Sequence, residues 1–68
     1  MSHKWIYHGD IGDGFAYCAH ILVRQNIKGA RRQMHVFYAD YEEVLWNDAI
    51  DFLTKGFSVI RVDLWEVS

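Results

Sequence analysis

The hydrophobic pattern of this chain has two periods, and each predicts a different secondary structure. Residues 15–24 alternate with a period of two, which indicates a β-strand. The predicted faces of this strand are Phe15, Tyr17, Ala19, Ile21 and Val23 on one side and Ala16, Cys18, His20, Leu22 and Arg24 on the other. From residue 41 the apolar residues recur at helical spacing instead. The predicted buried stripe of this helix is Tyr41, Leu45, Ala49 and Phe52, widened by Val44, Trp46, Ile50 and Leu53.

Glycine marks the other boundaries, because the chain contains no proline. Residues 3–8, 33–39 and 57–67 are predicted strands, residues 9–14 a glycine-rich turn, and residues 26–30 a hairpin connection centred near Gly29. The third strand is expected to place Met34, Val36 and Tyr38 on one face. The predicted faces of the last strand are Phe57, Val59, Arg61, Asp63 and Trp65 on one side and Ser58, Ile60, Val62 and Leu64 on the other.

Both ends of the predicted helix have recognisable signals. Asp40 with Glu43 three residues later has the spacing of a capping box, and Glu42 and Glu43 suit the positive end of the helix dipole. The signals at the other end are an i,i+4 pair, Asp51 and Lys55, and a stop at Gly56.

The order of elements is therefore β-β-β-α-β, which predicts a single α+β domain over residues 1–68. We expect a small sheet of three to four strands with one helix packed on one face. If the third and fourth strands lie side by side and parallel, the helix forms a right-handed crossover between them. The other face of the sheet must then be solvated or bind a partner.

Composition excludes several classes of protein. The single cysteine, Cys18, cannot form an internal disulfide, so a reducing cytoplasm is expected. We recognise no signal peptide, and no apolar run approaches the roughly 20 residues that span a membrane. The net charge of −2 argues against a dedicated nucleic-acid binder and against an acidic DNA mimic.

Three patterns invite a catalytic or metal-binding interpretation, and each has a simpler one. The four histidines lack metal-site spacing, although His20 and His35 are expected as cross-strand neighbours, and His3 and His8 on opposite faces. Cys18 and His20 share a predicted face but have no third catalytic group, which favours a buried structural thiol. The glycine-rich turn lacks the Lys-Ser/Thr of a phosphate loop and the ligand set of a calcium loop. We therefore predict no enzyme, no metal and no cofactor.

Charge is divided unevenly along the chain. Residues 1–35 have a balance of +3 and residues 36–68 a balance of −5, which suggests a surface of two signs and a polar partner. Lys28, Arg31 and Arg32, with Arg24 near, form a basic hairpin that either grips phosphate or an acidic protein surface, or is a solvated turn. Four sheet aromatics, Trp5, Tyr7, Tyr17 and Phe37, either stack on bases or pack in the core.

The last strand contains the clearest interface signal. Arg61, Asp63 and Trp65 share a predicted face, and Trp beside Arg is typical of a binding hot spot. The alternative is an ion pair with Trp65 packed near the chain end.

Residues 34–62 resemble a known family. The segments Tyr38-Ala39-Asp40, Glu42-Glu43 and Gly56-Phe57-x-Val59-x-Arg61-Val62 are similar to the gene 2 protein of short-tailed coliphages. The resemblance implies a small sheet with one helix. It also implies a protein that binds the jaw of the bacterial RNA polymerase β′ subunit and blocks formation of the open promoter complex. Two arginines of the family's last strand matter for this activity: Arg61 occupies the first position, and Asp63, of opposite charge, the second.

The predicted function is therefore a small phage-type inhibitor of a host machine, with RNA polymerase as the leading target, in the host bacterial cytoplasm. The predicted partner-binding residues are Arg61, Asp63, Trp65, Arg24, Lys28, Arg31, Arg32, Glu42 and Glu43. The alternatives are a nucleic-acid-binding module that uses the basic hairpin, an inhibitor of another host or defence enzyme, and a homodimer that buries its open sheet face.

Overall fold

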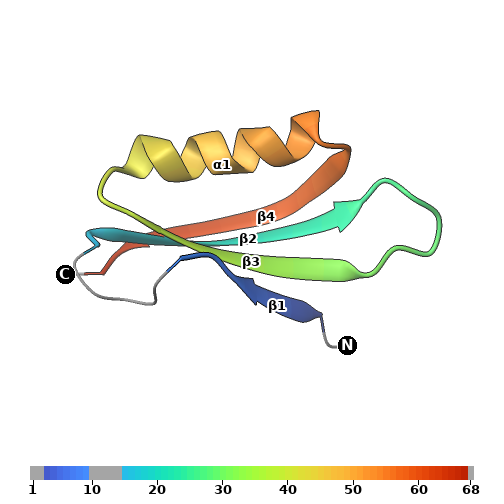
Figure 1. The fold of residues 1–68 in the computed structure, drawn as a ribbon, viewed down its shortest axis with the longest axis horizontal. Coiled ribbons are helices and arrows are strands. Elements are labelled where there is room, and N and C mark those ends of the chain that lie inside the picture. Colours follow the sequence, from blue (N-terminus) through green and yellow to red (C-terminus); the bar gives the residue numbers. More distant parts are fainter. Residues whose placement is uncertain (1–2, 10–14, 68) are drawn as a thin grey trace.

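The chain folds as a four-stranded sheet with one helix on one face (Figure 1). The computed structural model describes residues 3–9 and 15–67. Its elements are β1 (Lys4–Tyr7), β2 (Tyr17–Gln25), β3 (Arg32–Ala39), α1 (Glu42–Thr54) and β4 (Phe57–Glu66). The predicted α+β class and the order β-β-β-α-β are confirmed. Most of the predicted glycine-rich turn, from residue 10 to residue 14, lies outside the described residues.

The order of strands across the sheet is β1-β3-β2-β4. Strand β2 is antiparallel to both β3 and β4, and β1 is parallel to β3. Strand β2 therefore lies between β3 and β4, so the condition for a helical crossover between parallel neighbouring strands is not met. The central position suits β2, because both of its faces are apolar and pairing on both sides leaves neither backbone edge exposed.

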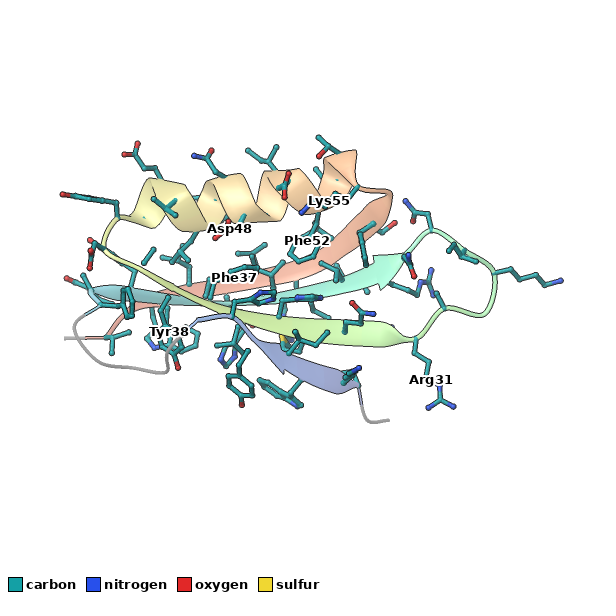
Figure 2. The ribbon with its side chains drawn as sticks, in the orientation of Figure 1. Arg31, Phe37, Tyr38, Asp48, Phe52 and Lys55 are labelled. Atoms are coloured by element: carbon teal, nitrogen blue, oxygen red, sulfur yellow. The ribbon has the colours of Figure 1, made fainter. Side chains whose placement is uncertain are left out.

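Helix α1 covers one face of the sheet and encloses the main core. This core contains Ala19, Ile21, Val23, Ala39, Leu45, Ala49 and Phe52. The rings of Phe37 and Phe52 meet between the helix and the sheet, whereas Tyr38 points to the opposite side (Figure 2). The predicted division of β2 into two faces is confirmed, and the face with Ala19, Ile21 and Val23 is the one that meets the helix.

The predicted stripe of the helix is only partly correct. Leu45, Ala49 and Phe52 are buried, but Tyr41 is 68% exposed. The added residues Val44, Trp46, Ile50 and Leu53 are exposed as well. One helix on a sheet buries only the stripe that faces the strands, so the flanks remain in solvent.

The predicted capping box is also wrong, whereas the end of the helix is confirmed. The N-cap is Tyr41 rather than Asp40, with no side-chain cap bond, and the helix starts at Glu42. At the other end Lys55 Nζ lies 2.7 Å from Asp51 Oδ2. Gly56 then has a φ of +86°, the left-handed conformation that ends many helices. Within the described part of the chain, no helix has the length and apolar character needed to cross a membrane.

A bulge in β4 changes which of its residues face the helix. The register with β2 shifts between Leu22 and Val23, so alternation fails near Ile60. As a result Phe57 and Val59 pack toward the helix together with Val62 and Leu64, although alternation placed the two pairs on opposite faces. Arg61, Asp63 and Trp65 remain together on the other face, opposite Leu22, His20 and Cys18 of β2.

Two leucines of α1 provide a matched test of this packing. Leu45 is fully buried and Leu53 is 57% exposed. We expect Leu45→Ala to lower the free energy of unfolding by about 3 kcal/mol, because it leaves a cavity against β2 and β4. Leu53→Ala should cost less than about 1 kcal/mol. Urea unfolding followed by circular dichroism measures both, and equal losses would contradict the described helix orientation.

Candidate functional site

The sheet face opposite the helix contains a continuous row of aromatic rings. Trp5 from β1 meets the edge of His20 from β2, with ring centroids 5.2 Å apart. His20 in turn meets Trp65 from β4 at 4.7 Å, and Tyr7 stacks beside Trp5 at 6.3 Å. We call Trp5, Tyr7, His20 and Trp65 the aromatic face. The row therefore spans all four strands from one edge of the sheet to the other.

The aromatic face covers a second, smaller core. Beneath it lie Cys18, Leu22, Met34 and Val36, none more than 6% exposed although the helix is on the other side of the sheet. The register explains this burial, because Trp5 pairs with Met34 and Trp65 with Cys18. The covering rings stay accessible: Trp5 is 48%, Tyr7 53% and Trp65 42% exposed. These rings thus bury the strands below and present apolar surface to solvent.

Charged residues border this face, and positive charge dominates. Arg61 Nε lies 2.9 Å from Asp63 Oδ2 along β4, two residues from Trp65. Arg24 and Arg32 lie directly opposite one another on β2 and β3 at the hairpin end. Like charges in such a pair repel, so a negatively charged partner would relieve them.

The predicted partner-binding residues fall into three places. Arg61, Asp63, Trp65, Arg24 and Arg32 share the face opposite the helix. Lys28 lies in the hairpin loop, where it lines a shallow hollow with Arg24, and Arg31 lies at the end of this loop (Figure 2). Glu42 and Glu43 begin α1 and so lie across the sheet from Arg61. One flat partner surface cannot contact all nine residues.

The four sheet aromatics divide between the two faces. Tyr17 and Phe37 pack against the helix-side core, as the core interpretation predicted. Trp5 and Tyr7 belong to the exposed row instead. Their role was not evident from the sequence, because it depends on the pairing of β1 with β3.

The predicted cross-strand histidine pair is wrong. His20 pairs with Val36 and His35 with Ile21, so the two histidines lie on opposite faces. Among the described residues there is also no group of three His, Cys, Asp or Glu side chains that could hold a metal ion. His3 and His8 do lie on opposite faces, His3 beside Trp5 and His8 against Phe37.

The thiol of Cys18 has the environment of a structural residue. It is 2% exposed, and burial raises its pKa, an effect that a hydrogen bond with Tyr38 partly opposes. Because only the thiolate is a strong nucleophile, a raised pKa disfavours catalysis. His20, on the same face, has its pKa lowered by burial, against the attraction of Asp63.

A second polar arrangement, which the sequence did not reveal, lies on the helix side of the sheet. His8 Nε2 is 2.7 Å from His35 Nδ1, and His35 Nε2 is 2.9 Å from Gln33 Oε1. Since the amide oxygen only accepts, His35 Nε2–H donates to Gln33. His35 Nδ1 is then an acceptor, and His8 Nε2–H donates to it.

Aromatic rings and one carboxylate surround this pair. The His8 ring stacks on Phe37 at 4.1 Å, and the His35 ring meets Phe52 at 4.6 Å. Burial, with a smaller contribution from His8, lowers the pKa of His35 to about 4. Partial burial raises the pKa of Asp48 on α1, while attraction to His8 opposes this rise (Figure 2). The pair thus joins the end of β1 to β3 beneath the helix.

No protein-family model, curated protein or solved structure matches this chain. The resemblance to the phage gene 2 proteins therefore stays a prediction, and the function rests on the geometry described above.

The buried His35 predicts how stability depends on pH. Its pKa is about 4 in the folded chain and near 6.5 when unfolded, so the unfolded state binds more protons between these values. The neutral ring makes its full contribution to the free energy of unfolding above about pH 6.5. This contribution falls by roughly 3 kcal/mol as the pH drops to about 4.

Urea unfolding at several pH values measures this dependence, with His35→Phe as the comparison. Because the groups outside the pair titrate in both proteins, the difference between the two curves reports His35 together with its coupling to His8. Parallel curves would show that His35 is protonated equally in the folded and unfolded chains.

Proposed function

We propose that this protein is a small inhibitor that binds a larger host protein through its aromatic face and the neighbouring Arg61 and Asp63. The first target to test is bacterial RNA polymerase, at the jaw of its β′ subunit. The observation that supports the proposal best is the exposure of Trp5, Tyr7 and Trp65 on one face that the helix leaves uncovered.

The composition of this face suits a protein partner. Trp, Tyr and Arg are the residues most enriched in binding hot spots, and all three types are present here. Both tryptophans are already held by ring contacts with His20, so little side-chain entropy is lost when a partner docks. The surface is thus prepared for binding before the partner arrives.

The charges suggest an acidic surface on the partner. Arg24, Arg32 and Arg61 border the face, and among the described strand residues on this face Asp63 is the opposing charge. The acidic residues of α1 lie on the far side of the sheet. The uneven distribution of charge along the sequence therefore corresponds to a positive face opposite the helix and a more acidic helix side. A partner of complementary charge would favour one orientation of docking.

The resemblance to the phage inhibitors is one reason to include Arg61 in the proposed interface. Arg61 is paired with Asp63 on the surface, and its side chain is 62% exposed. A partner carboxylate can therefore replace Asp63 with little desolvation cost, since exposed ion pairs contribute at most about 1 kcal/mol. Inhibition would follow from occupying the partner's surface and needs neither a catalytic group nor a cofactor. The site of action proposed with this target is the host bacterial cytoplasm.

Two of the three exposed tryptophans, which lie on opposite sides of the sheet, provide a matched test. Trp65 belongs to the aromatic face and is 42% exposed, whereas Trp46 on α1 is 45% exposed. We expect Trp65→Ala to weaken binding to purified bacterial RNA polymerase at least 30-fold, corresponding to a hot-spot loss of about 2 kcal/mol. Trp46→Ala should change the affinity less than about threefold.

Biolayer interferometry measures both affinities, and a promoter-opening assay reports inhibition. If the unchanged protein shows no binding to the polymerase, this target is wrong. If Trp46→Ala weakens binding more than Trp65→Ala does, the helix side is the interface.

A nucleic-acid-binding function is the second candidate, and the opposed Arg24 and Arg32 favour it. Phosphates would bridge these arginines while bases stack on the exposed tryptophans. In this case affinity for a single-stranded oligonucleotide should fall steeply with salt. Replacing both arginines by glutamine should reduce the slope by about 1.4, near 0.7 per phosphate contact. Fluorescence anisotropy measures the slope, and lack of binding at low salt would remove this candidate.

A further inference from the structure

We infer that the hydrogen bond between His8 and His35 is a pH-sensitive latch that holds β1 against β3 and thereby keeps Trp5 and Tyr7 in the aromatic face. The effect on partner binding rests on the function proposed above. The latch itself is a property of the free protein.

Strand β1 needs such a latch because its other attachments are few. It has four residues, Lys4 to Tyr7, and lies at the edge of the sheet, paired with β3 alone. Short edge elements open more readily than the strands between them. The backbone pairing continues one residue beyond the strand, where the His8 amide donates to the carbonyl oxygen of Val36 at 3.0 Å.

The side chain of His8 adds the strongest contacts at this end of β1. Its ring stacks on Phe37 at 4.1 Å with the planes 7° apart, and its Nε2–H donates to His35. His35 is 7% exposed and is itself held by Gln33 and by the ring of Phe52. The latch therefore connects an edge strand to the most buried polar side chain of the described residues.

The latch lies on one side of the sheet and controls residues on the other. His8 and His35 face the helix, whereas Trp5 and Tyr7 point to the opposite side. If β1 leaves the sheet, Trp5 loses its contact with His20 and uncovers Met34. Two of the three exposed aromatic residues proposed to bind the partner would be displaced together.

Protonation of His35 removes the acceptor on which the latch depends. In the closed latch the neutral His35 Nδ1 accepts the hydrogen bond from His8 Nε2–H. With a proton on His35 Nδ1, both facing nitrogens carry hydrogens and lie 2.7 Å apart. The hydrogen bond is then lost, and a positive charge lies in a buried site.

The charged groups around the pair do not prevent this protonation. From α1, Asp48 interacts with His8, and Asp51 and Lys55 act on Asp48 with opposite signs. The other neighbours of His35 carry no charge: they are Gln33 and Phe37 on β3, Phe52 on α1, and the paired residues Ile6 and Ile21. Burial lowers the pKa of His35 to about 4, so the closed latch resists its protonation. When β1 leaves the sheet, His35 gains access to water and loses its contact with His8, so its pKa rises toward its ordinary value. Opening therefore becomes more favourable as the pH falls through this window.

Hydrogen exchange of the free protein, followed residue by residue by NMR, tests the latch. After correction for the intrinsic exchange rate, the opening constant of the His8 amide should rise by up to about 30-fold between about pH 7.5 and about pH 5, the upper value corresponding to full return of His35 to its ordinary pKa. The amides of the central strand β2 should exchange at least tenfold more slowly than the His8 amide throughout, because they require unfolding of the sheet. The cross-relaxation between the Trp5 and His20 rings should weaken in parallel.

The variant His8→Phe separates the hydrogen bond from the stacking. Phenylalanine can keep the contact with Phe37 but cannot donate to His35. We expect β1 to open about fivefold more often at neutral pH, the loss of one hydrogen bond, and to respond less to acid. If this variant does not fold, the pH dependence of hydrogen exchange in the wild-type protein still tests the latch.

Two results would overturn the inference: a β1 opening constant that does not change with pH, or β1 amides that exchange only together with those of β2. Because no partner is present, these outcomes are independent of the polymerase measurement. That measurement is made at about pH 7.5, where the latch is closed. A latch that opens with acid in a protein that does not bind polymerase would reject the proposed function and keep the inference.

Discussion

Strand β2 is apolar on both faces, while the described part of the chain has one helix to cover it. The other elements are arranged around this imbalance. Cys18, Ala19, Ile21, Leu22 and Val23 are all at most 6% exposed, which requires a neighbour on each edge and a layer on each face. Helix α1 forms one layer. The second layer is formed by side chains from the edge strands, because two tryptophans and a tyrosine reach across the sheet where a second helix would otherwise lie.

This arrangement links stability to binding. A side-chain layer one ring thick buries the strands beneath it but leaves about half of each covering ring in water. The remaining exposed surface is apolar, rigid and bordered by arginines, which are the properties of a recognition surface. A domain of this size has a small interior, so few residues stabilise the fold without also contributing to the surface. The same residues therefore stabilise the fold and form the proposed interface. The hydrogen-bonded pair of His8 and His35 extends this coupling. It lies on the helix side of the sheet and holds β1, the strand that supplies two of the rings.

The departures from the predicted fold share one physical origin. The strand segments, the helix and its glycine stop follow from local pattern and were predicted closely. The neighbours of each strand were not predicted from local pattern. The position of β2 between β3 and β4 depends on how much apolar surface each possible strand order buries over the whole sheet. The bulge near Ile60 has the same origin, since it turns Phe57 and Val59 toward the helix while Arg61 and Asp63 stay in water. Strict alternation would either have buried Arg61 and Asp63 or turned Phe57 and Val59 away from the helix.

The sequence by itself determined which segments become strands and helix, how β2 divides into two faces, and that Arg61, Asp63 and Trp65 lie on one side of β4. Those features depend on residue spacing along the chain, which local backbone geometry converts directly into direction. Only the tertiary structure decided that Trp5 and Tyr7 join Trp65 through His20, that Arg24 and Arg32 share this face, and that His8 bonds to His35. Each of these contacts depends on the parallel pairing of β1 with β3 or on strand order, and such pairings are selected by the total burial they achieve rather than by any local pattern.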